Sequence, residues 1–100
     1  MTREDVVTGR SYGSSEAVLI RVVRRGGTLT VDDDGAAVPL AGRPAGWHDR
    51  AQGIVAATGA NVNRRGVVFV PATTEARLNR LIDLVATTSL EVYDALIDER

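Results

Sequence analysis

The spacing of hydrophobic and polar positions changes along this 100-residue chain, and the changes mark out its elements. The run AVLIRVVRR from Ala17 is β-branched and almost wholly apolar, which is typical of a buried strand. After the glycines of RRGG, the alternating TLTV predicts a second strand and therefore a hairpin. The acidic DDDG ends that strand, and Val38 and Leu40 around Pro39 predict a short third strand at an edge.

The second half of the chain predicts helices on either side of another hairpin. In WHDRAQGIVAAT, residues 47–58, apolar side chains recur at helical spacing, and Gly59 is suited to end the helix. ANVN and VVFVP flank a second Arg-Arg-Gly and predict a further hairpin, closed by Pro71. The last segment, TTEARLNRLIDLVATTSLEVYDALIDER, has helical stripes, but Thr88-x-x-Glu91 is a capping-box pattern, so we expect two helices here.

This order of elements predicts the fold class and the domain organisation. Hairpins separated by helices favour an α+β fold, with an antiparallel sheet of two hairpins and helices packed on one face. One hundred residues suit one domain. Residues 1–15 are polar and without period, which predicts a flexible N-terminal arm, and residues 16–100 then form the single α+β domain.

Several short motifs resemble a known family. They are the DDDG turn after a strand, a helix entered through His48, Asp49 and Arg50, the TGANVNRRGVVFV hairpin and a C-terminal helix. Together they resemble a little-studied bacterial and phage domain of unknown function, whose members have a TDDG turn, an Arg-bearing helix and a yGv…l hairpin. The resemblance spans residues 17–84, with Asp32 where the family has Thr, and it implies a fold but no activity.

Composition narrows the setting and the partners. The 12 basic residues, all arginine, balance 13 acidic ones for a net charge of −1, so any basic site must be local. The absence of cysteine excludes disulfides, thiolate metal ligands and cysteine nucleophiles, and it favours an intracellular setting. No apolar run has the length of a signal peptide or a membrane span, so we expect a cytoplasmic protein that does not contact the membrane.

The repeated Arg-Arg-Gly provides a candidate anion site, formed by Arg24, Arg25, Arg64 and Arg65. If the two hairpins lie side by side in the same orientation, four guanidinium groups meet at one end of the sheet and could bind a phosphate or carboxylates. The alternative is that each pair of arginines is simply the solvated tip of a hairpin. We favour the alternative.

Catalytic and metal-binding patterns are sparse. Consecutive side chains on a strand point to opposite faces, so at most two of Asp32, Asp33 and Asp34 could share an ion, and an acidic turn without metal is the better interpretation. His48 is the one histidine, and a general base formed with Asp32 or Asp34 is the least favoured hypothesis. Neither a phosphate loop nor a G-x-S-x-G elbow occurs, so we expect no cofactor and no catalytic residue.

These exclusions leave a small non-enzymatic protein-interaction or regulatory module. A homodimer is the expected assembly, and its contact surface would include the C-terminal stripe of Leu90, Tyr93, Leu96 and Ile97. Packing of that stripe on the chain's own sheet is an equal alternative. Binding of nucleic acid or phosphate by the paired Arg-Arg-Gly tips is the second function we consider.

Overall fold

The computed structural model describes residues 1–13 and 16–98. Its central element is a five-stranded antiparallel sheet. The strand order across the sheet is β1-β2-β3-β5-β4, and every neighbouring pair is antiparallel. The strands are β1 (Thr2–Tyr12), β2 (Glu16–Arg25), β3 (Thr28–Asp32), β4 (Asn61–Val62) and β5 (Val68–Thr73). Both hairpins expected from the sequence, β2–β3 and β4–β5, are confirmed.

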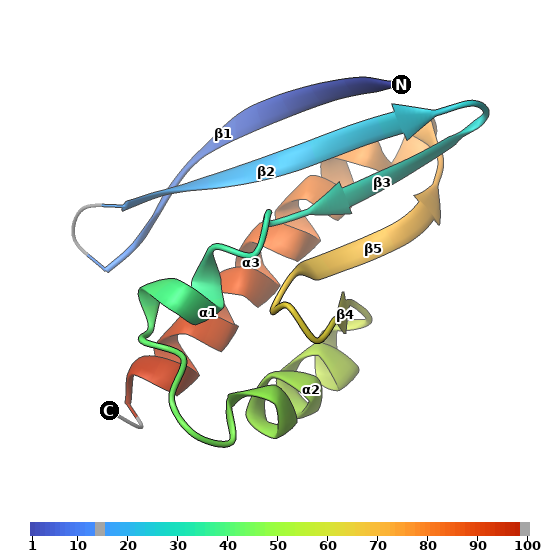
Figure 1. Cartoon of the computed structure of the whole chain (residues 1–100). Coiled ribbons are helices and arrows are strands. Elements are labelled where there is room, and N and C mark those ends of the chain that lie inside the picture. The colour runs from blue at the N-terminus through green and yellow to red at the C-terminus, as the bar shows by residue number, and fades with distance from the viewer. Residues whose placement is uncertain (14–15, 99–100) are drawn as a thin grey trace.

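The helices form a second layer on one face of the sheet (Figure 1). They are α1 (Ala37–Leu40), α2 (Trp47–Thr58) and α3 (Leu78–Ile97), the last preceded by a short 3₁₀ turn, η1 (Glu75–Arg77). The bounds of α2 agree with the sequence prediction, and Gly59 ends it with a φ of 88°. The predicted α+β class, with helices on one face of an antiparallel sheet, is therefore confirmed.

The core lies between these layers because alternate residues of the central strands point toward the helices. Val22 pairs with Val31, which in turn pairs with Val70, so one row of side chains faces α3. The opposite row lies on the face that the described helices do not cover, which we term the open face. Its central members are Arg21, Val23, Thr30, Asp32, Phe69 and Pro71.

The N-terminal segment is part of the sheet rather than an arm. Residues 2–12 pair with β2 as strand β1, with an irregularity between Val7 and Ser11 where Gly9 has a φ of 78°. Two anchors hold it, because Val6 lies against the core and the Tyr12 side chain is fully buried. The polar, mostly exposed residues that suggest an arm are those of an edge strand. Of the expected arm, Ser14 and Ser15 lie outside the described residues.

Two helical segments differ from the sequence predictions. Residues 37–40 form α1 instead of an edge strand, because Val38 is buried against the core when the chain turns here. α3 runs unbroken through the capping-box pattern, so the prediction of two helices is wrong. Thr88 and Ser89 are fully buried on the face of α3 that packs against the sheet. Both side chains pack in the core, and neither marks the start of a new helix.

The glycines of the two Arg-Arg-Gly turns provide a matched pair of stability tests. Gly26 and Gly66 both have left-handed backbone, with φ of 60° and 86°. A Cβ on Gly66 would lie 3.1 Å from Val38, whereas one on Gly26 would meet nothing within 4 Å. We expect Gly26→Ala to lower the free energy of unfolding by about 1 kcal/mol and Gly66→Ala by about 2–3 kcal/mol. Urea unfolding would measure both, and equal losses would contradict the close contact at Val38.

Candidate functional site

The two Arg-Arg-Gly turns lie at opposite ends of the sheet. β3 and β5 are antiparallel, with Leu29 opposite Thr73 and Asp32 opposite Phe69. The β2–β3 turn therefore lies near the end of β5, and the β4–β5 turn lies where β5 begins (Figure 1). The four guanidinium groups do not meet, so the structure does not bring the candidate anion site together. The two hairpins do not share one orientation, because β3 and β5 are the second strands of their hairpins and run antiparallel to each other.

The arginines of the β2–β3 turn have partners within the chain. Arg24 donates hydrogen bonds to Glu75, and its Nη1 lies 3.3 Å from Glu4 Oε1. These acidic partners raise the pKa of Arg24 above its usual value. Arg25 Nη2 lies 3.3 Å from the Met1 sulfur. Arg24 therefore ties this tip to β1 and η1.

The arginines of the β4–β5 turn are held differently. Asn63 Oδ1 accepts hydrogen bonds from the backbone amides of Arg65 and Val67, at 2.9 and 3.0 Å, and so fixes the turn. Arg65 then lines a pocket on the open face, while Arg64 lines a separate pocket with Trp47 and His48. Neighbouring arginines of one turn thus serve two different surfaces.

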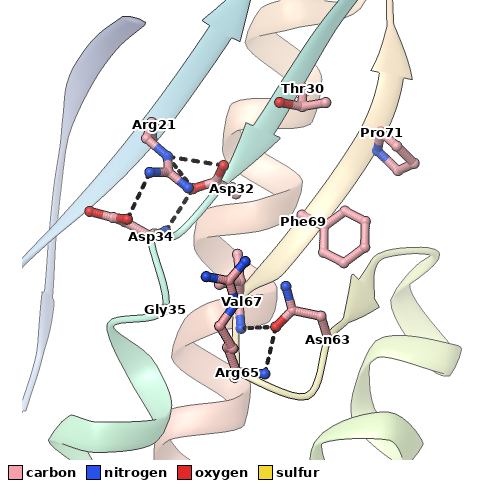
Figure 2. Close-up of a pocket in the computed structure, with 10 residues that line it drawn as sticks. All are labelled: Arg21, Thr30, Asp32, Asp34, Gly35, Asn63, Arg65, Val67, Phe69 and Pro71. Carbon is pink, nitrogen blue, oxygen red and sulfur yellow. Dashed lines mark hydrogen bonds and ion pairs between the residues drawn. The ribbon is translucent and has the colours of Figure 1, made fainter.

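Of the pockets on the open face, the one lined by Arg65 and Phe69 is the candidate functional site, and it has a volume of about 460 Å³. Its lining residues come from β2, β3, the turn after β3, the β4–β5 turn and β5 (Figure 2). Phe69 and Pro71 contribute an apolar wall from β5, and charged groups from β2 and β3 form the wall opposite. The site exists because the sheet leaves this face uncovered while the strand order brings β3 beside β5.

On the side of the pocket formed by β2, β3 and the turn after β3, one cation, Arg21, pairs with two anions, so one negative charge remains there. Arg21 Nε donates to both carboxylate oxygens of Asp32, at 2.9 and 3.1 Å, and its Nη1 lies 3.0 Å from Asp34 Oδ1. The hydrogen bond with Asp32 raises the pKa of Arg21. Asp32 Oδ1 also accepts from the backbone amide of Asp34, which shapes the acidic turn. In the described residues no three acidic or histidine side chains are grouped as metal ligands.

Arg65 is a cation of this pocket that no acidic group of the described residues neutralises. Figure 2 shows its side chain pointing into the space between the Arg21 group and Asn63, and no ion pair joins it to a described residue. The Asn63 side-chain oxygen faces the turn, and its amide nitrogen is directed away from the turn, on the side of Phe69 (Figure 2). A guanidinium beside an amide donor and an apolar wall can bind a carboxylate attached to an apolar group.

A buried polar network lies behind the site and was not predicted from the sequence. Ser89 Oγ donates to Asp33 Oδ2 at 2.6 Å, and Tyr12 lies 2.6 Å from the same hydroxyl, to which it must donate. Asp33 Oδ1 accepts from the backbone amides of Gly35 and Val68, at 2.8 and 2.9 Å. Burial raises the pKa of Asp33, and it raises the pKa of Tyr12 to about 12. The network joins β1, the acidic turn, β5 and α3.

The candidate general base His48 lies apart from the pocket on the open face. The rings of His48 and Trp47 meet edge to face, with their centroids 5.2 Å apart. His48 lines a separate pocket with Trp47 and Arg64. Asp32 and Asp34 belong to the open-face pocket, so the structure does not assemble the hypothetical general base.

The C-terminal stripe packs on the chain's own core. Leu96 is fully buried, and the remaining three side chains of the stripe are partly buried against the core: Leu90, Tyr93 and Ile97. The Tyr93 ring also lies 5.4 Å from the ring of Tyr12. The structure therefore corresponds to the alternative in which this stripe packs on the chain's own sheet. These side chains are engaged within the chain, so they offer little surface for a second copy.

Comparisons with known proteins give no relative. Neither a family model, nor a curated protein, nor a solved structure matches the chain. Among the described helices, none has the length and apolar character needed to cross a membrane. Function must therefore be argued from the geometry of the site.

Proposed function

We propose that this protein is a small, non-enzymatic binding module whose open face holds an acidic segment of a partner protein. One observation supports this most directly: Arg65 lines the pocket with no acidic partner in the part of the chain that the structure describes, next to the apolar wall of Phe69 and Pro71. A partner's Asp or Glu side chain would pair with Arg65, and a neighbouring apolar side chain would pack on that wall. The cysteine-free sequence supports a cytoplasmic setting.

Several features favour a protein segment over nucleic acid as the ligand. A polyphosphate chain in this pocket would face the carboxylates of Asp32 and Asp34, and Arg21 is already engaged by both. Phe69 is the one aromatic side chain lining the pocket, whereas single-stranded nucleic acid is usually held by several stacking rings. The net charge of −1 adds no long-range attraction for a polyanion. One carboxylate matches the single available cation better.

The chemistry of the lining supports binding rather than catalysis. Both carboxylates of the pocket are already engaged by Arg21, through hydrogen bonds or an ion pair. The buried hydroxyls of Ser89 and Tyr12 lie in the core, where a ligand cannot reach them. The polar groups facing the pocket are suited to orienting a ligand.

Selection from a random-peptide display library would test the proposed function. We expect the selected peptides to place Asp or Glu beside an apolar residue. Arg65→Ala should weaken their binding about tenfold, because a charge-assisted pair is lost while the apolar wall remains. Fluorescence anisotropy with one labelled selected peptide would measure the change.

Arg80→Ala is the matched control, because Arg80 is an exposed arginine on α3, in the helical layer. Its loss should leave the peptide affinity unchanged. Equal effects of the two variants, selection of basic peptides, or stronger binding of a mixed-sequence single-stranded oligonucleotide that depends on Arg65 would each overturn the proposal.

A further inference from the structure

The outer edge of β1 is an uncovered pairing surface. β1 pairs with β2 on one side, and Figure 1 shows its other side at the margin of the sheet. Residues 1–5 and Val7 are exposed, and Met1 and Val7, at 81% and 73%, are the most exposed large hydrophobic side chains described. Between them lie a cation and two anions in the order Arg3, Glu4, Asp5. An edge with two exposed apolar groups on either side of charges of both signs can match a copy of itself.

We infer that two copies of this chain associate by antiparallel pairing of their β1 edges, centred on Glu4. In this register Arg3 lies opposite Asp5 of the second copy, and the same pair forms again across the two-fold axis. Met1 lies opposite Val7 of the second copy, so the two most exposed apolar groups cover each other. Opposite charges and apolar pairs directly across a strand pair are both stabilising.

Other registers are less favourable. A shift of one residue would put helix-side residues of one copy opposite open-face residues of the other. A shift of two residues puts either Asp5 or Arg3 opposite its own copy, and like charges in this position are destabilising. Further shifts bring in the irregularity at Gly9. In the preferred register the two Glu4 side chains are opposite each other, but each lies 3.3 Å from Arg24 of its own chain.

The charged residues of the edge are available for such pairing. Among residues 1–13 and 16–98, the ion pairs of Arg3 are both long, at 3.5 Å to Asp5 and 3.7 Å to Asp34, and all three side chains are more than half exposed. Such exposed pairs contribute little to stability, so exchanging them for pairs with a second copy costs little. Glu4 keeps its own partner in Arg24.

The pairing has consequences for shape and strength. A two-fold axis perpendicular to the sheet makes one continuous sheet, with both helical layers on one side and both open-face pockets on the other. The paired stretch, residues 1–7 of each copy, is short and should bury less than the roughly 1,200 Å² typical of stable complexes, so the dimer should be weak and concentration-dependent. This inference does not rest on the proposed function, because Arg65 and Phe69 lie far from β1 in the strand order.

Exchanging the charges on β1 tests the inference. Sedimentation equilibrium of the full chain from about 10 µM to about 1 mM should show a monomer–dimer equilibrium. Arg3→Asp or Asp5→Arg alone should weaken dimerisation about tenfold, since each places like charges opposite each other twice. The double variant Arg3→Asp/Asp5→Arg restores opposite charges across the axis and should restore the dimer.

Glu91→Arg, an acid-to-arginine change at an exposed position of α3, is the matched control and should leave the dimer unchanged. Circular dichroism would confirm that each variant is folded. A wild-type chain that stays monomeric throughout, a dimer insensitive to either single change, or a double variant that fails to recover would each overturn the inference. Peptide binding through Arg65 would persist in all three cases, so the two proposals fail separately.

Discussion

Replacing Asp33 with alanine is expected to lower the free energy of unfolding by about 3–4 kcal/mol, a large fraction of the stability of a small domain. Asp33 accepts hydrogen bonds from the backbone amides of Gly35 and Val68 and from the Ser89 hydroxyl. Alanine would leave these donors buried without an acceptor, and each such loss is costly. Urea unfolding monitored by circular dichroism would measure the change.

Asp33→Asn is the matched control for this prediction. Its Oδ1 can accept from the same two amides, and its amide nitrogen can donate to Ser89, which then donates to Tyr12. Stability at neutral pH should therefore be retained or increased, because the asparagine has no charge to bury. A loss equal to that of alanine would show that the carboxylate itself, and not its acceptor geometry, holds the turn.

The same control isolates a pH dependence. Burial raises the pKa of Asp33 above its ordinary value of 3.8, so above that pH the unfolded chain loses this proton while the folded chain still binds it. The folded state binds more protons in this window, and the contribution of Asp33 to stability falls as the pH rises through it. The stability advantage of Asp33→Asn over wild type should grow from pH 3.8 upward until the folded carboxyl has also ionised. A constant difference across this range would contradict the raised pKa.

Replacing Leu96 with alanine should lower the free energy of unfolding by about 2–4 kcal/mol, because the side chain is fully buried and its removal leaves a cavity. Leu19→Ala, on the open face and 44% exposed, should change it by no more than about 0.5 kcal/mol. Thermal and urea unfolding of both variants would measure this difference.

Sedimentation of the same variants separates core packing from assembly. Leu96→Ala should leave the association of the folded chain unchanged, since Leu96 faces the chain's own core. A variant that keeps its stability but loses association would show instead that the end of α3 is an interface between chains.

Local patterns predicted the parts of the fold that local physics decides. The β2–β3 and β4–β5 hairpins follow from β-branched runs next to Gly26 and Gly66, and both glycines have the positive φ that such turns require. The α2 helix follows from its apolar spacing and from Gly59. These signals lie within a few residues of the elements they define.

Elements that depend on distant partners were not predicted correctly. β1 alternates weakly, and it is a strand because β2 offers an edge and because Tyr12 reaches Ser89 on α3. The capping-box pattern in α3 did not break the helix, because Thr88, its cap residue, is fully buried on the face that packs against the sheet. Tertiary contacts override local preference at both positions.

The candidate site depended on strand order, which the sequence does not state. Arg65 was a candidate from its turn, but the expected companions Arg24 and Arg25 lie at the other end of the sheet. Its actual neighbours, Phe69 and the Arg21 group, come together because β3 pairs with β5. The adjacency of these two strands had no signal in composition or spacing.

Locating a bound peptide on the ¹⁵N-labelled protein tests most directly the claim that the open face is the binding surface. A selected acidic peptide with a nitroxide label would broaden the nuclear magnetic resonance signals of nearby residues. We expect broadening at Asn63, Arg65 and Phe69, with Arg80 and Glu91 on α3 unaffected. Broadening centred on Arg80 and Glu91, with the signals of the open face intact, would contradict it.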